Sequence, residues 1–117
     1  MWTDEDEEVV ADFVNEIKIM APLKHPNLIF FYGGVWTAGV GRMCIVLEFA
    51  GRGGLDKAIG TSDLRWSRWG WPVACDIAKA LVYIHSCNLI HRDIKPANVL
   101  LTASFTAKMA VSDVENY

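Results

Sequence analysis

The sequence is poor in the features that mark several large classes of protein. Its 117 residues contain three cysteines, Cys44, Cys75 and Cys87, and no Cys-x-x-Cys pair. An odd number of cysteines without paired spacing suits free thiols in a reducing compartment better than a disulfide framework or a zinc site. The formal net charge is −3, and without clustered lysine and arginine the chain lacks the field that attracts a phosphate backbone. We expect no nucleic-acid partner.

Long apolar runs and a secretory leader are also missing from this sequence. The longest uncharged stretch, residues 26–41, is interrupted by four glycines and falls short of the ~20 apolar residues that a membrane-spanning helix needs. Residues 1–8 are acidic, whereas a secretory signal begins with basic residues before an apolar run. The default expectation is a cytoplasmic protein with no membrane partner.

The sequence does have enough apolar side chains for one modest core. Hydrophobic residues make up 52% of the chain and charged residues 21%, which is far from the composition of disordered segments. A chain of this length can bury one core but cannot form two independently folded units. We therefore predict a single folded domain.

The first predicted element is an amphipathic helix that begins after Thr3. An acidic run, residues 4–7, follows this hydroxyl, and carboxylates in the first turn are favourable at the positive end of the helix dipole. Apolar residues then recur at spacings of three and four and form one stripe. They are Val10, Phe13, Ile17 and Met20. Pro22 is expected to close the helix.

Two apolar runs after this helix are predicted to form an antiparallel pair of strands. Residues 28–36 and 43–49 are rich in aromatic and β-branched side chains, which favour strands. Gly39 and Gly41 lie between the two runs and suit a turn. A short helix is predicted over residues 55–59.

A second long helix is predicted over residues 72–86. Its apolar stripe consists of Ala74, Ile77, Leu81 and Ile84. Pro72 is tolerated because the first turn of a helix does not use its N–H groups. From residue 89 onward, short apolar groups alternate with polar residues and predict a functional loop followed by short strands. The predicted fold class is α+β.

Three tryptophans precede the second long helix. Trp66, Trp69 and Trp71 could form a platform on which bases stack, but only Arg65 and Arg68 accompany them. Without more positive charge, packing against the protein is the better interpretation.

One segment, residues 91–101, carries a strong chemical pattern, His-Arg-Asp-Ile-Lys-Pro-Ala-Asn-Val-Leu-Leu. Phosphoryl transfer needs a carboxylate near the attacking hydroxyl, a cation near the moving phosphoryl group and oxygen ligands for Mg²⁺. Asp93, Lys95 and Asn98 have side chains suited to these three tasks. The segment resembles the catalytic loop of eukaryotic protein kinases, His-Arg-Asp-x-x-x-x-Asn.

This resemblance implies a role for each of the three residues. Asp93 would orient and deprotonate the substrate hydroxyl, Lys95 would lie beside the γ-phosphate, and Asn98 would ligate a metal ion. Lys95 followed by proline is similar to the serine/threonine-specific pattern. The alternative is a solvated turn without function, but the joint match after a long amphipathic helix argues against coincidence.

Upstream residues extend the resemblance. Glu16 is similar to the helix-C glutamate that pairs with a phosphate-holding lysine in kinases, although a helical glutamate on its own is usually a solvated surface residue. Residues 23–28, Leu-Lys-His-Pro-Asn-Leu, resemble the family's link from helix C to strand four.

Residues 46–49 resemble strand five where it enters the hinge between the two kinase lobes. The resemblance implies that backbone groups of residues 48–50 bind the adenine of ATP and that Leu47 is the gatekeeper. The residues expected to bind the nucleotide are Leu47, Glu48, Phe49, Ala50, Leu100 and Glu16. An ordinary edge strand followed by a turn remains the alternative here.

Residues 77–85 resemble helix E, with His85 as a structural or surface residue, and the tryptophans before it are similar to those of the tyrosine-kinase-like group. The resemblance implies a partial protein-kinase-like fold over residues 1–117. Residues 4–49 would be a remnant of the amino-terminal lobe with helix C and strands four and five. Residues 50–117 would begin the carboxyl-terminal lobe, with helix E and the catalytic loop.

Several parts of the kinase pattern are not found in this sequence. No Gly-rich loop or strand-three lysine precedes the first helix, so Glu16 would lack its cationic partner. The Mg²⁺-binding Asp-Phe-Gly is expected soon after Ala110, but the chain there reads Val-Ser-Asp-Val-Glu. Asp113 could reach the metal position only through a bulge, and Mg²⁺ demands near-octahedral oxygen ligands. Without the activation segment and later helices, the apolar face of helix E would be bare.

The activity implied by the resemblance is ATP- and Mg²⁺-dependent phosphoryl transfer to serine or threonine hydroxyls of protein substrates. We expect this chain alone to have little or none of it. One alternative is a catalytically dead, pseudokinase-like module that binds a partner such as a complete kinase. The other is a truncated gene model of an active kinase. Retention of Asp93, Lys95 and Asn98 argues against a long-standing loss of catalysis.

Overall fold

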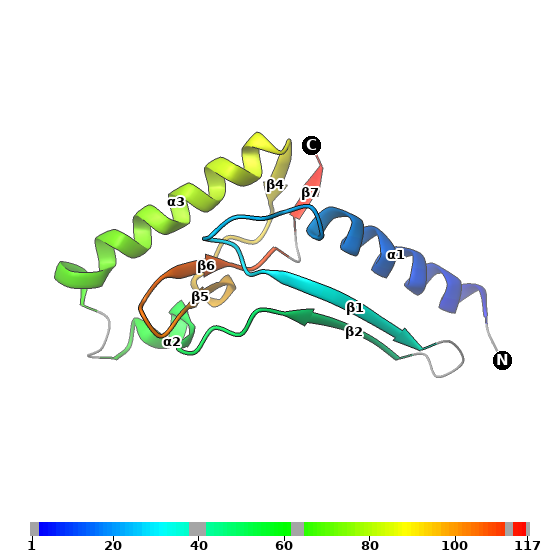
Figure 1. Ribbon diagram of the computed structural model, residues 1–117, viewed down its shortest axis with the longest axis horizontal. Helices are drawn as coiled ribbons and strands as arrows, with labels where there is room; N and C mark the ends of the chain where they lie inside the picture. The colour runs from blue at the N-terminus through cyan, green and yellow to red at the C-terminus, as the bar shows by residue number, and fades with distance from the viewer. Residues whose placement is uncertain (1–2, 38–41, 62–64, 112–113, 117) are drawn as a thin grey trace.

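The computed structural model describes residues 3–37, 42–61, 65–111 and 114–116 (Figure 1). It confirms the predicted α+β class. The helices are α1 (Asp4–Met20), the single turn α2 (Leu55–Ala58) and α3 (Trp71–Ser86). The strands are β1 (Phe31–Thr37), β2 (Arg42–Leu47), β3 (Gly53–Gly54), β4 (Leu89–His91), β5 (Val99–Leu101), β6 (Ala107–Met109) and β7 (Val114–Asn116).

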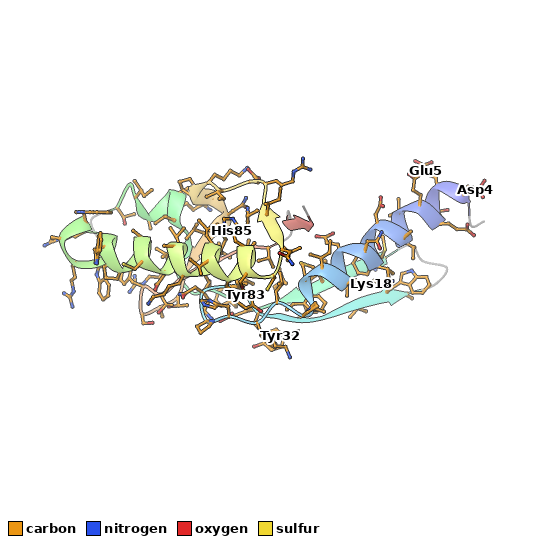
Figure 2. All side chains as sticks on the ribbon, turned by 90° about the horizontal axis from the view of Figure 1, so that it is seen from above. Asp4, Glu5, Lys18, Tyr32, Tyr83 and His85 are labelled. Atoms are coloured by element: carbon orange, nitrogen blue, oxygen red, sulfur yellow. The ribbon has the colours of Figure 1, made fainter. Side chains whose placement is uncertain are left out.

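The molecule is elongated, with principal extents of 56 × 29 × 20 Å. Helix α1 and the β1–β2 hairpin extend toward one end, whereas α2, α3, β5 and β6 gather toward the other (Figure 1). Figure 2 shows Asp4 and Glu5 at the far tip of α1, and Tyr83 and His85 on α3. The two long helices, α1 and α3, therefore occupy different parts of the molecule.

Helix α1 begins as the sequence predicts. The N–H of Thr3 donates to Asp6 Oδ2 at 2.8 Å, and the N–H of Asp6 donates to Thr3 Oγ1 at 3.2 Å, so the two residues form a capping box. The hydrogen bonds from Thr3 hold the pKa of the Asp6 carboxyl below its usual range. The helix ends at Met20, just before Pro22, whose ring cannot continue a helix.

Strands β1 and β2 form the predicted antiparallel hairpin, with Phe31 opposite Leu47 and Thr37 opposite Arg42. Helix α1 lies on this hairpin at Gly34, where a β-carbon would come within 2.7 Å of Ile17 Cδ1. The missing side chain thus allows the close approach of helix and strand. Gly39 and Gly41, the predicted turn residues, lie outside the described part of the chain.

The predicted start of the first strand is wrong by three residues, because Leu28 and Ile29 pair with β6 and Phe30 bonds to Glu48, which lies beyond the end of β2. Leu28 forms an isolated parallel bridge with Met109 of β6. The Ile29 N–H donates to the Met109 carbonyl at 3.0 Å, and the Met109 N–H donates to the Asn27 carbonyl at 2.8 Å. The chain therefore lies beside β6, at the edge of the core sheet, before β1 begins. At the other end, β2 stops at Leu47 instead of continuing to Phe49.

The core lies between α3 and the antiparallel sheet β3–β5–β6. Side chains alternate along β5 and β6, as in any strand. Val99, Leu101, Ala107 and Met109 are consequently buried, whereas Leu100 and Lys108 are half-buried. Helix α3 contributes Val73, Ala80 and Ile84. The predicted helices over 55–59 and 72–86 and the short strands after residue 89 are confirmed within a residue or two.

The prediction that all three tryptophans pack against the protein is wrong for two of them. Trp69 does pack, with its ring stacked on Phe105 at a centroid distance of 4.6 Å. Trp66 and Trp71 are each 69% exposed. Trp66 begins a single π-helical turn, Trp66–Gly70, and Trp71 follows it as the first residue of α3. No other described element covers the exposed parts of these two rings.

Two further expectations concern the surface. Cys44, Cys75 and Cys87 are free thiols, as predicted, and His85 is exposed. Across the described residues, no helix is both long enough and apolar enough to cross a bilayer.

Candidate active site

His91 anchors the amino end of the loop that the sequence singles out. Its ring is buried beneath the end of β4, 8% exposed. The N–H of Asp93 donates to His91 Nδ1 at 3.1 Å, and Nε2 lies 2.7 Å from the carbonyl oxygen of Ala110. Because Nδ1 accepts a hydrogen bond, the ring proton belongs on Nε2, which donates to Ala110. The histidine thus joins the loop to the residue that follows β6.

Lys95 and Asn98 converge on the carboxylate of Asp93. The Lys95 ammonium lies 3.1 Å from Asp93 Oδ2, and Asn98 Nδ2 donates to the same oxygen at 3.1 Å and to the Asp93 carbonyl at 2.8 Å. The side chains of Lys95 and Asp93 are 54% and 43% exposed, so the group is accessible from solvent. The structure therefore brings together Asp93 and Lys95, the two predicted catalytic residues, and Asn98, the predicted metal ligand.

The same contacts set the charge of this group. The hydrogen bond from Lys95 has the largest influence on the pKa of Asp93. Burial, the second-largest influence, acts in the opposite direction, but the hydrogen bonds from Lys95 and Asn98 and the nearby positive charge outweigh it. The pKa of the Asp93 carboxyl consequently lies below its usual range. Asp93 is therefore an anion at neutral pH, a good hydrogen-bond acceptor but a weak base.

A short turn holds the loop against the core sheet. Pro96–Asn98 form a 3₁₀ turn directly before β5, where the ring of Pro96 suits a first turn. The Asn98 N–H donates to the Lys95 carbonyl at 2.9 Å, and the Ala110 N–H donates to the Asn98 carbonyl at 2.9 Å. Both ends of residues 91–98 are thus tied to Ala110.

The predicted nucleotide-binding segment follows β2. Leu47 is 44% exposed, Phe49 is 88% exposed and Ala50 is 7% exposed. The Glu48 N–H donates to the Phe30 carbonyl at 2.8 Å, and the Gly53 N–H donates to the Ala50 carbonyl at 3.1 Å. The pairing of β3 with β5 then places Gly54 opposite Leu100.

The Glu48 carboxylate is the best-connected acid in this region. Its Oε2 lies 2.6 Å from Lys108 Nζ, and its Oε1 accepts the Phe30 N–H at 3.0 Å. Burial alone would raise the pKa of Glu48, but the hydrogen bonds from Lys108 and Phe30 and the charge of Lys108 lower it overall. Sequence reasoning missed Lys108, although a lysine between the apolar residues Ala107 and Met109 of a short strand was a usable signal.

Two other predicted residues stand apart from this arrangement. Glu16 is half-buried on α1 and makes no ion pair within the described part of the chain. Asp113 lies outside the described residues. Across those residues, no three acidic, histidine or cysteine side chains come close enough to hold a metal ion.

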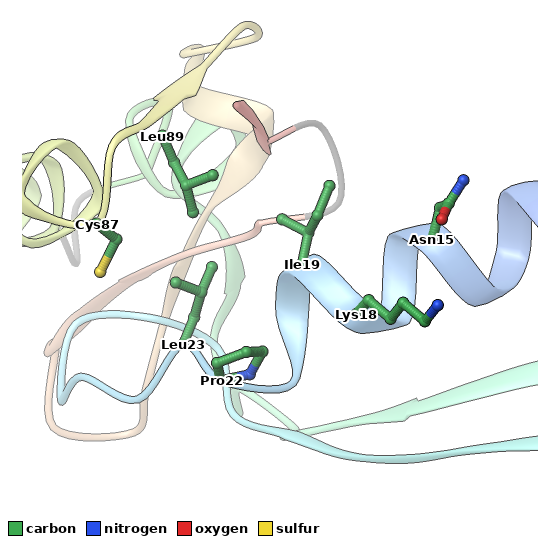
Figure 3. Close-up of a pocket in the computed structure, with 7 residues that line it drawn as sticks. All are labelled: Asn15, Lys18, Ile19, Pro22, Leu23, Cys87 and Leu89. Atoms are coloured by element: carbon green, nitrogen blue, oxygen red, sulfur yellow. The ribbon is translucent and has the colours of Figure 1, made fainter. Parts of the chain in front are cut away.

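A cavity of about 630 Å³ lies apart from the loop (Figure 3). It lies between the carboxyl end of α1 and the start of β4. Its walls are Asn15, Lys18, Ile19, Pro22, Leu23, Cys87 and Leu89. None of these is a predicted site residue.

Comparison with known proteins now decides the family. A model of the family described as protein tyrosine and serine/threonine kinase matches residues 1–114, which is nearly the whole chain. The chain belongs to the protein kinase family. The resemblance drawn from residues 91–101 is thereby confirmed at the level of the family.

Relatives among curated kinases are consistent with this assignment. The chain is 35% identical over 105 residues to the leaf rust 10 disease-resistance locus receptor-like protein kinase-like 1.3 of Arabidopsis thaliana, covering 86% of this chain and 15% of that protein. It is 34% identical over 114 residues to the serine/threonine-protein kinase CTR1 of the same plant, covering 93% and 14%. For the serine/threonine-protein kinase Aurora-1, also from Arabidopsis thaliana, the identity is 36% over 95 residues, covering 81% and 32%. The chain thus spans less than a third of the length of each of these three kinases.

Proposed function

We propose that this chain is part of a serine/threonine protein kinase domain of the tyrosine-kinase-like group. Residues 4–49 belong to the amino-terminal lobe in this proposal, with α1 as helix C and β1 and β2 as strands four and five. Residues 50–117 begin the carboxyl-terminal lobe, with α3 as helix E. The order of these elements in a chain that matches the kinase family model supports the assignment.

The observation that carries the proposal is the convergence of Lys95 and Asn98 on the Asp93 carboxylate. In the family reaction, ATP supplies the phosphoryl group and a serine or threonine of a protein substrate accepts it. Asp93, an exposed anion with a lowered pKa, would accept a hydrogen bond from the substrate hydroxyl and orient it. Lys95 would place a positive charge beside the phosphates.

The backbone of residues 48–50 fits the adenine end of ATP. Adenine presents a hydrogen-bond donor beside an acceptor, and the Glu48 carbonyl and the Ala50 N–H are the complementary pair. Within the described residues, no hydrogen bond of the protein engages either group, whereas the Glu48 N–H and the Ala50 carbonyl are both bonded. Leu47, Phe49 and Leu100 would supply apolar contacts.

The residues that would bind the Mg²⁺ beside the phosphates of ATP fit that role less well. Asn98 turns its amide nitrogen toward Asp93, and among the described residues no cluster of metal-ligating side chains exists. The sequence between β6 and β7 holds no Asp-Phe-Gly. We therefore propose that the chain by itself transfers phosphoryl groups poorly or not at all.

A phosphorylation assay tests this impairment. The purified chain is incubated with labelled ATP, Mg²⁺ and a mixture of serine and threonine peptides, beside Asp93→Asn and the exposed control Asp56→Asn. We expect the native chain and both variants to give the same background. Mg²⁺-dependent incorporation that Asp93→Asn abolishes and Asp56→Asn preserves would overturn the proposed impairment.

A second candidate function is a pseudokinase-like module that binds a partner, for example a complete kinase. The exposed apolar side chains of Trp66, Trp71 and Val82, 69–70% accessible, favour it. A pull-down that yields no stable partner would count against this candidate. An in-frame Asp-Phe-Gly found in the coding DNA around Ala110 would instead point to an active kinase with a truncated gene model.

A further inference from the structure

Glu48 joins three elements through one carboxylate. It directly follows β2, its Oε1 accepts the N–H of Phe30 just before β1, and its Oε2 pairs with Lys108 of β6. The two charged side chains are only 22% and 17% exposed, for Glu48 and Lys108 respectively. A charge-assisted contact that is largely shielded from water is stronger and less mobile than a surface ion pair.

The carboxylate replaces a backbone acceptor. Opposite residues of an antiparallel hydrogen-bonded pair normally exchange both of their N–H···O bonds. The Glu48 N–H does donate to the Phe30 carbonyl at 2.8 Å. The return bond from the Phe30 N–H, however, goes to the Glu48 side chain at 3.0 Å instead of the Glu48 carbonyl. That carbonyl is consequently left out of the strand ladder.

Lys108 is held firmly enough to keep the Glu48 carboxylate in place as the acceptor of the Phe30 N–H. The next residue, Met109, is 1% exposed and exchanges backbone hydrogen bonds with Asn27 and Ile29. Strand alternation then places Lys108 on the opposite face from the core, where its ammonium meets Glu48. If the ammonium were removed, the shielded carboxylate would lose its counter-charge and turn toward water. The Phe30 N–H could then bond the Glu48 carbonyl and complete the ladder.

We propose that Lys108 is a positioning residue for purine binding: by holding the Glu48 carboxylate on the Phe30 N–H, it keeps the Glu48 carbonyl available to a nucleotide. This inference rests on the proposed role of residues 48–50. Lys108 itself need not touch the nucleotide. Its effect passes through Glu48.

The test compares Lys108→Met with Lys79→Met, the same substitution at an exposed position of α3. Two measurements are made on the full chain. In the absence of any ligand, NMR measures the rates at which the Phe30 and Glu48 backbone amides exchange their hydrogens with solvent. Calorimetry reports the affinity for ADP in the absence of divalent metal. Lys108→Arg, which keeps the cation, tests rescue, and Lys108→Gln replaces Lys108→Met if the latter does not fold.

We expect Lys108→Met to change the exchange of the Phe30 and Glu48 amides and to weaken ADP binding about tenfold. Lys79→Met should leave both unchanged, and Lys108→Arg should restore most of the affinity. If the native chain does not bind ADP, the proposed role of residues 48–50 is wrong. If the native chain binds ADP but Lys108→Met leaves either the amide exchange or the affinity unaltered, the positioning role is wrong.

Discussion

Asn27 joins the segment before β1 to the core sheet through one buried side chain. It is 6% exposed, and its Nδ2 donates to the Ala107 carbonyl at 3.0 Å. Its backbone N–H donates to His25 Nδ1, also at 3.0 Å. Among the described residues, no buried side-chain polar atom lacks a hydrogen-bond partner. The attachment of this segment to β6 therefore depends on complete hydrogen bonding.

Replacing Asn27 by alanine should lower the free energy of unfolding by about 1–3 kcal/mol. The reason is that the Ala107 carbonyl would lose its partner inside the protein. Urea denaturation measures the change. Asn15→Ala, on the exposed face of α1, is the matched control and should shift stability by no more than about 0.5 kcal/mol. If the two variants lowered the free energy of unfolding equally, the stabilising role of the Asn27 hydrogen bond would be contradicted.

At the scale of residues, the sequence predicts a site best where its members are close in the chain. Asp93, Lys95 and Asn98 lie within one short loop, so their spacing already limits how far apart they can be. Glu48 and Lys108 meet only because β6 lies beside the start of the hairpin. No local pattern encodes that meeting. The isolated position of Glu16 was likewise beyond sequence reasoning, because it depends on what surrounds α1.

At the scale of elements, α3 shows how differently two neighbouring positions contribute. Ile84 is fully buried against the core sheet, whereas Val82 is 70% exposed on the other face of the same helix. We expect Ile84→Ala to destabilise the chain by about 2–5 kcal/mol because it removes buried methyl groups and leaves a cavity. Val82→Ala should change stability by no more than about 0.5 kcal/mol. Thermal or urea unfolding followed by circular dichroism gives both values.

A small loss of stability for Ile84→Ala would mean that α3 does not pack on the core sheet as described. A large loss for Val82→Ala would mean that this face is covered in solution. The two variants together therefore test the orientation of the helix as well as the core.

Both long helices could be predicted because their apolar residues repeat with a helical period and their ends carry a capping residue or a proline. The start of strand β1 at Phe31 could not be predicted from the sequence. Residues 28–30 have the same apolar, β-branched and aromatic character as β1, but Leu28 and Ile29 pair with β6, and Phe30 bonds to Glu48, which lies beyond the end of β2. The exposure of Trp66 and Trp71 was missed for a similar reason, since it depends on which other elements pack near them and not on the local sequence.

At the scale of the whole molecule, the core is confined to one part of the chain. Within the described residues, the buried apolar cluster draws on α3, β5 and β6, whereas Met20 is the only buried residue of α1. Hydrogen exchange should therefore be uneven, because segments with few buried contacts open at low cost. We expect amides of residues 8–12 in α1 to exchange about tenfold or more faster than those of residues 80–84 in α3.

Mass spectrometry of exchanged peptides measures this difference on the intact chain. Residues 80–84 serve as the internal reference, since they belong to a helix of similar length. Uniform protection of the two helices would show that α1 is stabilised by contacts that this structure does not contain.

The length of helix α1 sets how far a small rotation would carry its acidic tip. Its 17 residues span about 25 Å, and near its carboxyl end the Lys24 N–H donates to the Tyr83 hydroxyl of α3 at 2.9 Å. A rotation of roughly 10° about that attachment would move the acidic tip by roughly 4 Å over a rod of this length. Any such rotation would therefore be magnified at the opposite end of the molecule.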